Sequence, residues 1–291
     1  MIRLWLLGVF AIGALAACGG DAVVDVEGDL RAAIAAAEPG TILRLAGNEF
    51  QGPVVIEKPL QLIGSQGTVI VAPPDSPAVT IKHTEDVTLS NLSIRGGASG
   101  VFIRSSVGVV LEGIRISEAQ WHGVFAHDAE VEITGCEISG LQAAKPQGIE
   151  IINSDSRPTS VVSGCRVEGP VFEGIVSHVS NVTFEDNVVS QAAPRGIVIT
   201  EMSVGTMIGN RVIDGSGSAL FCGDMSRCSI IDNDIRRISA VPGGYRSAMG
   251  HGVVIHFHST AYVEGLQASD VEGDTVLVML ESQLSPEPFD P

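Results

Sequence analysis

Aromatic residues and lysines are scarce in this chain. Aromatic residues make up 4% of the 291 residues, and only three residues are lysines. Positive charge is also in short supply, because 17 Lys and Arg residues face 34 Asp and Glu residues, for a net charge of -17. Nucleic acids and anionic membrane surfaces attract basic proteins. The composition therefore excludes a general nucleic-acid or anionic-membrane binder and predicts a core of Val, Ile, Leu and Ala.

Long apolar runs are missing except at the N-terminus. Arg3 precedes an apolar run from Leu4 to Ala14, which has the length of a signal-peptide core. The run ends in Leu-Ala-Ala-Cys at 15–18 and resembles the lipobox of bacterial lipoproteins, with an ordinary signal peptide as the alternative. We expect a signal peptide at 1–17, lipidation of Cys18 and a tether at 18–28. Such a protein belongs to the cell envelope and meets the membrane only through its N-terminal lipid.

Glycine is plentiful, with 34 residues, and it marks a repeat. Units that read Gly, apolar, any residue, apolar begin at Gly100, Gly123, Gly148, Gly174, Gly196 and Gly252, and Ala78 and Ala219 occupy the same position in two further units. The steps between units are 22, 23, 25, 26, 22, 23 and 33 residues, and a second alternating run follows each first one. Alternation predicts strands, and a period in the low twenties predicts one solenoid coil per unit. The step of 33 predicts an insertion at 237–250.

One column of the repeat predicts an internal ladder. Aligning the second runs places these residues in one column: Leu92, Ile114, Cys136, Cys165, Asn187, Asn210 and Asn233. If the column points inward, the asparagine amides must hydrogen-bond to one another along the axis. Cys136 and Cys165 would then be neighbours, either as a disulfide or as an unbonded thiol pair. Cys222 and Cys228 flank one turn, which a disulfide between them could clip.

The two ends of the repeat differ in composition. Residues 29–37 predict a short helix with Asp29 as N-cap, stopped by Pro39 and Gly40 and placed to cover one open end of the solenoid. Residues 281–291 form an acidic, Pro-rich tail that we expect to be disordered.

The segment DLRAAIAAAEPGTILRLAGNEFQGPVVIEKPLQLIGSQGTVI at 29–70, together with the repeats, resembles the pectin-lyase-like parallel β-helix proteins. The resemblance implies an all-β fold, a single right-handed parallel β-helix of about ten coils over 29–280. That superfamily includes pectate and alginate lyases, polygalacturonases, pectin esterases, uronan epimerases, adhesins and β-helix proteins of copper-enzyme maturation. The fold does not choose among these functions.

Polar residues gather on the first strand of each coil. All seven histidines lie between one residue before the repeat glycine and six residues after it. Alternation predicts that the second and fourth residues after the glycine point outward. The predicted catalytic residues on this face are His127, Arg104, Glu150 and His178. The predicted substrate-binding residues are Lys82, Phe102, Phe125, Asp128, Arg195 and Glu201.

The preferred hypothesis is a uronan lyase or C5-epimerase. Removing the proton beside a uronate carboxylate needs a base and a cation that neutralises the carboxylate. We assign these roles to His127 and Arg104, which should stack in adjacent coils. The stretch Phe125-Ala126-His127-Asp128 resembles the Asp-Pro-His-Asp motif of alginate epimerases in its second half only.

Three alternatives stay open. A glycoside hydrolase needs two carboxyl groups, for which Glu150 and Glu201 are available. A non-catalytic carbohydrate-binding or cell-surface module needs only the face itself. A metal-handling protein of the periplasm, for copper or a divalent ion, would use His251, His256 and His258. Apart from that metal ion, the sequence calls for no cofactor, and its expected partner is a polysaccharide.

Overall fold

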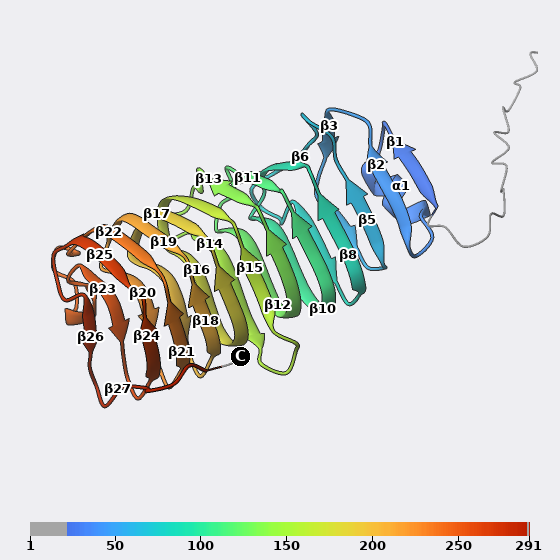
Figure 1. The fold of residues 1–291 in the computed structure, drawn as a ribbon. Coiled ribbons are helices and arrows are strands. Elements are labelled where there is room, and N and C mark those ends of the chain that lie inside the picture. Colours follow the sequence, from blue (N-terminus) through green and yellow to red (C-terminus); the bar gives the residue numbers. More distant parts are fainter. Residues whose placement is uncertain (1–21, 290) are drawn as a thin grey trace, which may run out of the picture.

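The computed structural model describes residues 22–289 and 291. The chain winds into a right-handed parallel β-solenoid of about 11 turns, which confirms the predicted fold (Figure 1). The predicted signal peptide and Cys18 lie outside the described residues. None of the helices in the described part is long and apolar enough to cross a membrane.

Each coil contributes strands to three parallel sheets. The first sheet holds β4 (Val54–Ile56), β7 (Val79–Lys82), β14 (Gln147–Ser154), β20 (Ser218–Cys222), β23 (His251–Ile255) and β26 (Val276–Val278). The second holds β1 (Val23–Val26), β2 (Thr41–Leu45), β5 (Leu60–Ile63), β8 (Glu85–Ser90), β15 (Ser160–Ser163), β18 (Val204–Ile208), β21 (Arg227–Ile231), β24 (Thr260–Glu264) and β27 (Gln283–Leu284).

The third sheet holds β3 (Glu49–Gln51), β6 (Val69–Ala72), β9 (Ser93–Gly96), β11 (Arg115–Ser117), β13 (Glu137–Ser139), β19 (Arg211–Ser216), β22 (Asp234–Ser239) and β25 (Gln267–Val271). Four long strands bend from one sheet into the next: β10 (Ser99–Glu112), β12 (His122–Thr134), β16 (Arg166–Glu185) and β17 (Val188–Thr200). This continuity holds the first-sheet face in register with the rest of the coil.

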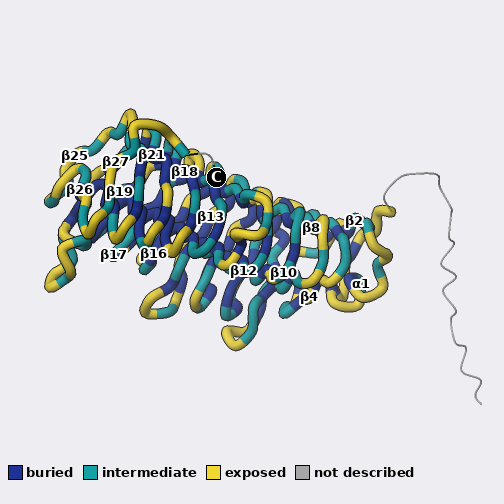
Figure 2. The backbone as a smooth tube through the Cα atoms, turned by 90° about the horizontal axis from the view of Figure 1, so that it is seen from below, coloured by how far each residue is buried: buried dark blue, intermediate teal, exposed yellow. Residues whose placement is uncertain are grey.

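The core is a narrow column of aliphatic side chains inside the coils. Figure 2 shows buried residues along the solenoid and exposed residues at many turns and outer loops. At the glycines that start first-sheet strands there is no room for a side chain: a Cβ on Gly148 would lie 2.3 Å from the Gly174 carbonyl oxygen and 2.5 Å from Cγ1 of Val167. Glycine is therefore a packing requirement in these coils, whereas the coils with Ala78 and Ala219 accommodate a methyl group at this position.

The predicted asparagine ladder is present and fully buried. The Asn210 side-chain oxygen accepts hydrogen bonds from the Asn187 backbone N–H at 3.1 Å and from Asn187 Nδ2 at 3.0 Å. Asn233 repeats the same two contacts with Asn210 at 2.9 and 3.1 Å. Cys136 and Cys165 extend this column as free cysteines. They are therefore an unbonded thiol pair and not a disulfide.

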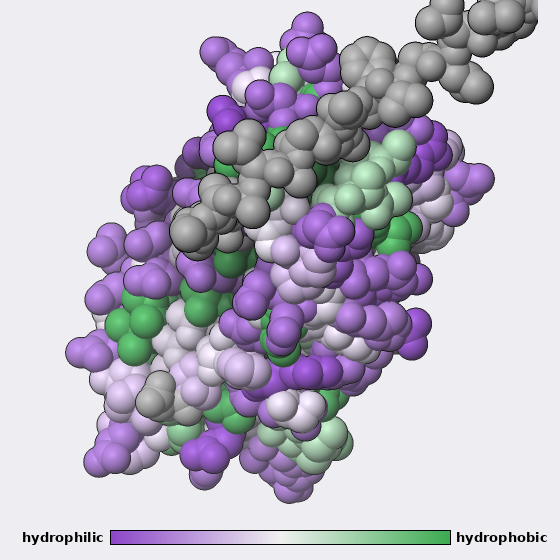
Figure 3. Space-filling view, turned by 90° about the vertical axis from the view of Figure 1, so that its right-hand side faces the viewer, coloured by the Kyte–Doolittle hydropathy of each residue, from purple (hydrophilic) through white to green (hydrophobic). Residues whose placement is uncertain are grey.

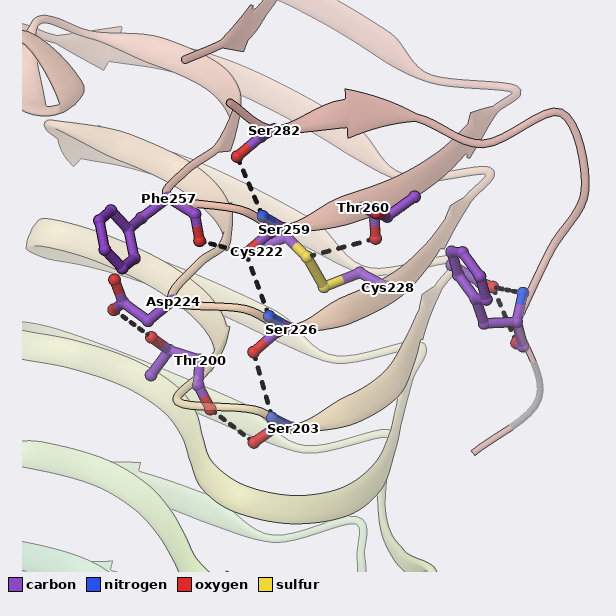
Figure 4. Close-up of a disulfide and its surroundings, with 12 residues drawn as sticks. Thr200, Ser203, Cys222, Asp224, Ser226, Cys228, Phe257, Ser259, Thr260 and Ser282 are labelled. Carbon is purple, nitrogen blue, oxygen red and sulfur yellow. Dashed lines mark hydrogen bonds between the residues drawn. A yellow bond between two sulfur atoms is a disulfide. The ribbon is translucent and has the colours of Figure 1, made fainter. Parts of the chain in front are cut away.

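A second ladder, of serines, was not anticipated. It follows the turn between the first and second sheets through Ser154, Ser180, Ser203, Ser226, Ser259 and Ser282. From Ser180 onward, each hydroxyl accepts a hydrogen bond from the backbone N–H of the serine one coil before it, at 3.1–3.2 Å, as Figure 4 shows for Ser203 to Ser282. In the same region Cys222 and Cys228 form the predicted disulfide across one turn.

The N-terminal end is capped as predicted. Helix α1 (Leu30–Ala36) is capped by the Asp29 carboxylate, which accepts from the Arg31 and Ala32 N–H groups, and it buries Leu30 and Ile34. Where the surface of this end is visible in Figure 3, polar residues surround separate apolar patches. Part of the segment expected to be a tether forms β1, which pairs with β2, so the solenoid starts before residue 29.

The C-terminal tail is ordered, and the expectation of disorder was wrong. Strand β27 pairs with β24, and the chain then crosses the second sheet. The backbone N–H of Phe289 donates to the Ser229 hydroxyl, which in turn donates to the Phe289 carbonyl, while the Arg227 guanidinium lies 4.6 Å from the Phe289 ring. These partners on the sheet hold a segment whose composition alone suggests no structure.

Candidate functional site

The outer face of the first sheet divides into two halves. In the N-terminal half, the column two residues after the repeat position holds Thr80, Phe102, Phe125 and Glu150, which are Cα partners in successive coils. In the C-terminal half the same column is apolar and buried, with Val176, Val198, Phe221, Val254 and Leu277 in one cluster. The polar groups that could meet a ligand are thus concentrated before Val176.

Glu150 is the last polar residue of this column and faces two histidines. Its Oε2 is 3.0 Å from Nε2 of His122, and its Oε1 is 3.6 Å from Nε2 of His178. The other ring nitrogen of His178 lies 3.4 Å from Oε1 of Glu201. The Glu150 side chain is only 13% exposed, and both of its oxygens face imidazole nitrogens. The structure brings together three predicted residues here and adds His122.

Stacked rings lie beside this carboxylate. The rings of Phe102 and Phe125 stack with centroids 5.5 Å apart, and His122 stacks on Phe125 at 4.8 Å. Trp121 precedes His122 and is 55% exposed. Such half-buried ring faces suit the apolar faces of sugar rings. The two phenylalanines were predicted from alternation, whereas Trp121 was not, because it belongs to a turn outside the repeat pattern.

A short row of cations lies along the column four residues after the repeat position. Lys82, Arg104 and His127 are Cα partners in three successive coils. Lys82 pairs with Glu57 at 3.2 Å, whereas Arg104 is exposed and has no ion-pair partner in the part of the chain that the structure describes. The predicted pair of Arg104 and His127 is therefore adjacent, and the arginine is available to an external carboxylate.

His127 has one nitrogen in use. Its Nε2 lies 3.2 Å from Nδ2 of Asn153 in the next coil, which identifies Nε2 as the acceptor and places the ring proton on Nδ1. Nδ1 is buried and has no hydrogen-bond partner among residues 22–289 and 291. Asn153 was not among the predicted site residues. Its only signal in the sequence is its position five residues after the repeat glycine.

Asp128 is held in an internal contact. Its Oδ1 accepts from Arg157 Nε at 2.8 Å, and its Oδ2 accepts from the Ser105 hydroxyl at 3.0 Å. The hydrogen bond from Arg157 lowers the pKa of Asp128 below its ordinary value of 3.8. The carboxylate therefore stays ionised and anchors the loop that carries Arg157 next to His127.

Arg195 is also engaged within the protein. It pairs with the buried carboxylate of Glu173, which in addition accepts from Gln147 Nε2 at 2.9 Å. The Arg195 guanidinium lies 4.9 Å from the Phe221 ring. The structure thus places Arg195 over the apolar half of the face, away from the Arg104 row.

The three histidines suggested for a metal ion are not brought together. His251 is buried, with Nε2 on the Arg246 carbonyl and Nδ1 on the Asp274 N–H. His256 faces Asp224 and His258 faces Glu281. Positive φ angles at Phe257 and His258 turn the chain after β23, so His256 and His258 do not share a strand face as the alternation suggested. Within the described residues, no group of three or more His, Cys, Asp or Glu side chains is arranged to hold a metal ion.

Comparisons with solved structures agree with the fold. An alginate lyase from Paenibacillus sp. str. FPU-7 superimposes with a TM-score of 0.72 at 15% identity, covering 90% of this chain and 99% of that one. A polygalacturonase from Erwinia carotovora ssp. carotovora gives 0.65 at 9% identity, covering 96% and 98%. A mannuronic acid specific polysaccharide family 6 lyase from human gut microbiota gives 0.63 at 14% identity, covering 88% and 67%. At such identities the likeness shows the fold alone.

The sequence comparisons point the same way. No curated protein matches the chain. The model of the right-handed beta helix region matches residues 77–235, which is more than half of the 291-residue chain and includes the whole polar half of the first-sheet face. The chain therefore belongs to the right-handed beta helix family.

Proposed function

We propose that this protein binds an acidic polysaccharide along the first-sheet face, from Lys82 to His178, and processes it as a lyase or C5-epimerase. The observation that carries the proposal is the exposed, unpaired Arg104 directly beside His127. Among the described cations of this face, Lys82, Arg157 and Arg195 already face carboxylates, so Arg104 is the one left for a substrate. The alginate lyase, the polygalacturonase and the mannuronic acid specific lyase named above support a polysaccharide ligand.

The proposed chemistry follows from these two residues. Arg104 neutralises the uronate carboxylate, which makes the adjacent C5 proton more acidic. Nε2 of His127 exchanges its contact with Asn153 for that proton. If the C4–O bond then breaks, its electron pair stays on the leaving oxygen, which takes a proton from water, and the product carries a C4–C5 double bond. If instead water gives a proton to C5 on the opposite face, the product is the C5 epimer. In both cases His127 releases the abstracted proton to solvent. Phe102 and Phe125 pack against the neighbouring sugar ring.

The net negative charge of the chain restricts where on its surface an acidic polysaccharide can bind. At a net charge of -17, most of the surface repels a polyanion. A short row of cations on one face is then the place where an acidic polymer gains attraction. We further propose that the protein works in the cell envelope, attached through a lipid on Cys18, and that a polysaccharide is its partner.

The test is absorbance at about 232–235 nm with a panel of uronans, where a new C4–C5 double bond absorbs, together with NMR of the C5 configuration. Arg104→Gln should lower kcat/KM by about 100-fold or more, and His127→Gln should abolish turnover. Arg166→Gln is the matched control, because Arg166 is exposed and unpaired within the described chain but starts β16 on the third sheet. Equal loss in the control would contradict the proposed site.

A non-catalytic carbohydrate-binding module is the second candidate. It is favoured because His127 and both oxygens of Glu150 already contact other side chains of the protein and would have to leave them to react with a substrate. Polymer binding that is weakened by Arg104→Gln, without any new absorbance and with unchanged C5 configuration, would establish this candidate and remove both enzymatic ones.

A further inference from the structure

Ser99, His122 and Glu150 form a series of three polar side chains, each within contact distance of the next. Ser99, at the start of β10, is the Cα partner of His122 one coil on, and its Oγ lies 3.2 Å from Nδ1 of His122. The opposite ring nitrogen, Nε2, lies 3.0 Å from Oε2 of Glu150 in the following coil. Hydroxyl, imidazole and carboxylate thus lie in sequence across three coils.

The partners decide where the protons lie. An ionised carboxylate only accepts hydrogen bonds, so the proton of a neutral His122 belongs on Nε2, facing Glu150. Nδ1 then carries the lone pair and faces the Ser99 hydroxyl. This is the state in which an imidazole can remove a proton from a serine.

The surroundings hold the imidazole in this orientation. Its ring stacks on Phe125 with centroids 4.8 Å apart, and its side chain is 20% exposed. His178 lies 3.6 Å from the other oxygen of Glu150, which keeps the carboxylate turned toward both rings. A fixed base and a fixed carboxylate are what nucleophilic catalysis by serine requires.

We infer that Ser99, His122 and Glu150 form a hydrolytic triad that removes small O-acyl groups, such as acetyl esters, from a polysaccharide. The polymeric substrate rests on the proposed function, whereas the ester chemistry rests on these three residues. Ser99 is only 6% exposed, which favours short acyl groups over long ones.

The reaction balances with water as the second substrate. Ser99 Oγ attacks the ester carbonyl carbon while Nδ1 of His122 takes the hydroxyl proton. The C–O bond to the sugar breaks, and His122 returns that proton to the sugar oxygen, leaving an acyl-serine. Water then attacks the acyl carbon and gives its proton to His122. The carboxylic acid leaves as the Ser99 oxygen regains the proton, so ester and water yield acid and alcohol.

The first test is ester hydrolysis, measured as release of p-nitrophenol from p-nitrophenyl acetate and of acetate from an acetylated uronan. Ser99→Ala should lower the rate by at least about 100-fold. Ser218→Ala is the matched control: Ser218 occupies the same position of its coil in β20 and is 1% exposed, but its hydroxyl has no hydrogen-bond partner within the described part of the chain. Equal rates in wild type and Ser99→Ala, or equal loss in both variants, would overturn the triad.

The second test does not depend on a variant folding. A fluorophosphonate probe should label the wild-type protein at Ser99, as located by mass spectrometry of the peptide, and His122→Gln should reduce labelling. Absence of label on Ser99 overturns the inference. Ser99→Ala should retain any uronan lyase or epimerase activity, since that activity is assigned to Arg104 and His127. Loss of one activity is therefore distinguishable from loss of the other.

Discussion

At the scale of single residues, the solenoid depends on polar groups that satisfy one another along its axis. Asn210 is completely buried, and its amide also donates to the Phe184 carbonyl at 2.8 Å. The next coil must therefore supply a partner at this position, as Asn233 does for Asn210. A buried polar group that loses its partner costs about 1–3 kcal/mol.

Asn210→Ala should therefore lower the free energy of unfolding by about 2–4 kcal/mol, because the Asn187 amide and the Phe184 carbonyl lose partners together. Denaturant unfolding followed by circular dichroism measures this. Asn181→Ala is the control, since its side chain makes one exposed bond to the Asp155 carbonyl and should cost less than about 1 kcal/mol. Equal losses would show that the ladder adds nothing beyond a surface contact.

Asp128 gives a residue-scale prediction about pH. Its pKa is lower in the folded protein than its ordinary value of 3.8, chiefly through the hydrogen bond from Arg157. The stabilisation is therefore complete above that ordinary value and is lost as the pH falls through the folded pKa. Asp128→Asn should cost less than about 1 kcal/mol at pH 7, because the pair is partly exposed, and the cost should shrink as the pH falls below 3.8. Denaturant unfolding at a series of pH values measures this, and a cost that stays unchanged on acidification would assign the effect to packing.

At the scale of elements, the strand starts on the first sheet are set by coil-to-coil contact. The glycine at 148 brings its own coil against the Gly174 carbonyl and the Val167 side chain. This close approach is what places the next residues, up to Glu150, in register with His122 and His178.

Gly148→Ala should destabilise the fold by about 1–3 kcal/mol, because the added methyl has no space and the coils must separate. Gly28→Ala is the control, since a Cβ there meets nothing within 4 Å. Thermal melts of both variants provide the measurement. An unchanged melting temperature for Gly148→Ala would mean that adjacent coils tolerate wider spacing than the structure shows.

At the scale of the whole molecule, stability is carried by contacts between neighbouring coils. The asparagine ladder lies in the middle coils, and the serine ladder runs on from them to Ser282. The last coil has neighbours on one side only and leaves Val278, Leu280 and Leu284 exposed. In such a quasi-one-dimensional fold the ends open first unless they are capped. Helix α1 caps the N-terminal end. At the C-terminal end, the tail is held against the second sheet by the hydrogen bond between Phe289 and Ser229.

Hydrogen exchange should therefore be graded along the axis. We expect amides of β25 to β27 to exchange at least about 10-fold faster than those of β14 to β21 in native-state hydrogen–deuterium exchange. Phe289→Ala removes the ring beneath Arg227 and should speed exchange in β24 and β27 without changing β14. Uniform exchange along the solenoid would indicate a single cooperative unit.

Repetition and alternation in the sequence predict the coil period, the three-asparagine ladder, the capping helix and a polar outer face on the first sheet. Local sequence records such patterns directly. The folded structure adds that His122 and Ser99 join Glu150, that Asp128 and Arg195 are engaged within the protein, that the C-terminal histidines are apart and that the tail is ordered. These outcomes depend on side-chain contacts between residues about 20 to 60 positions apart, and no local pattern specifies which of several polar neighbours a side chain will face.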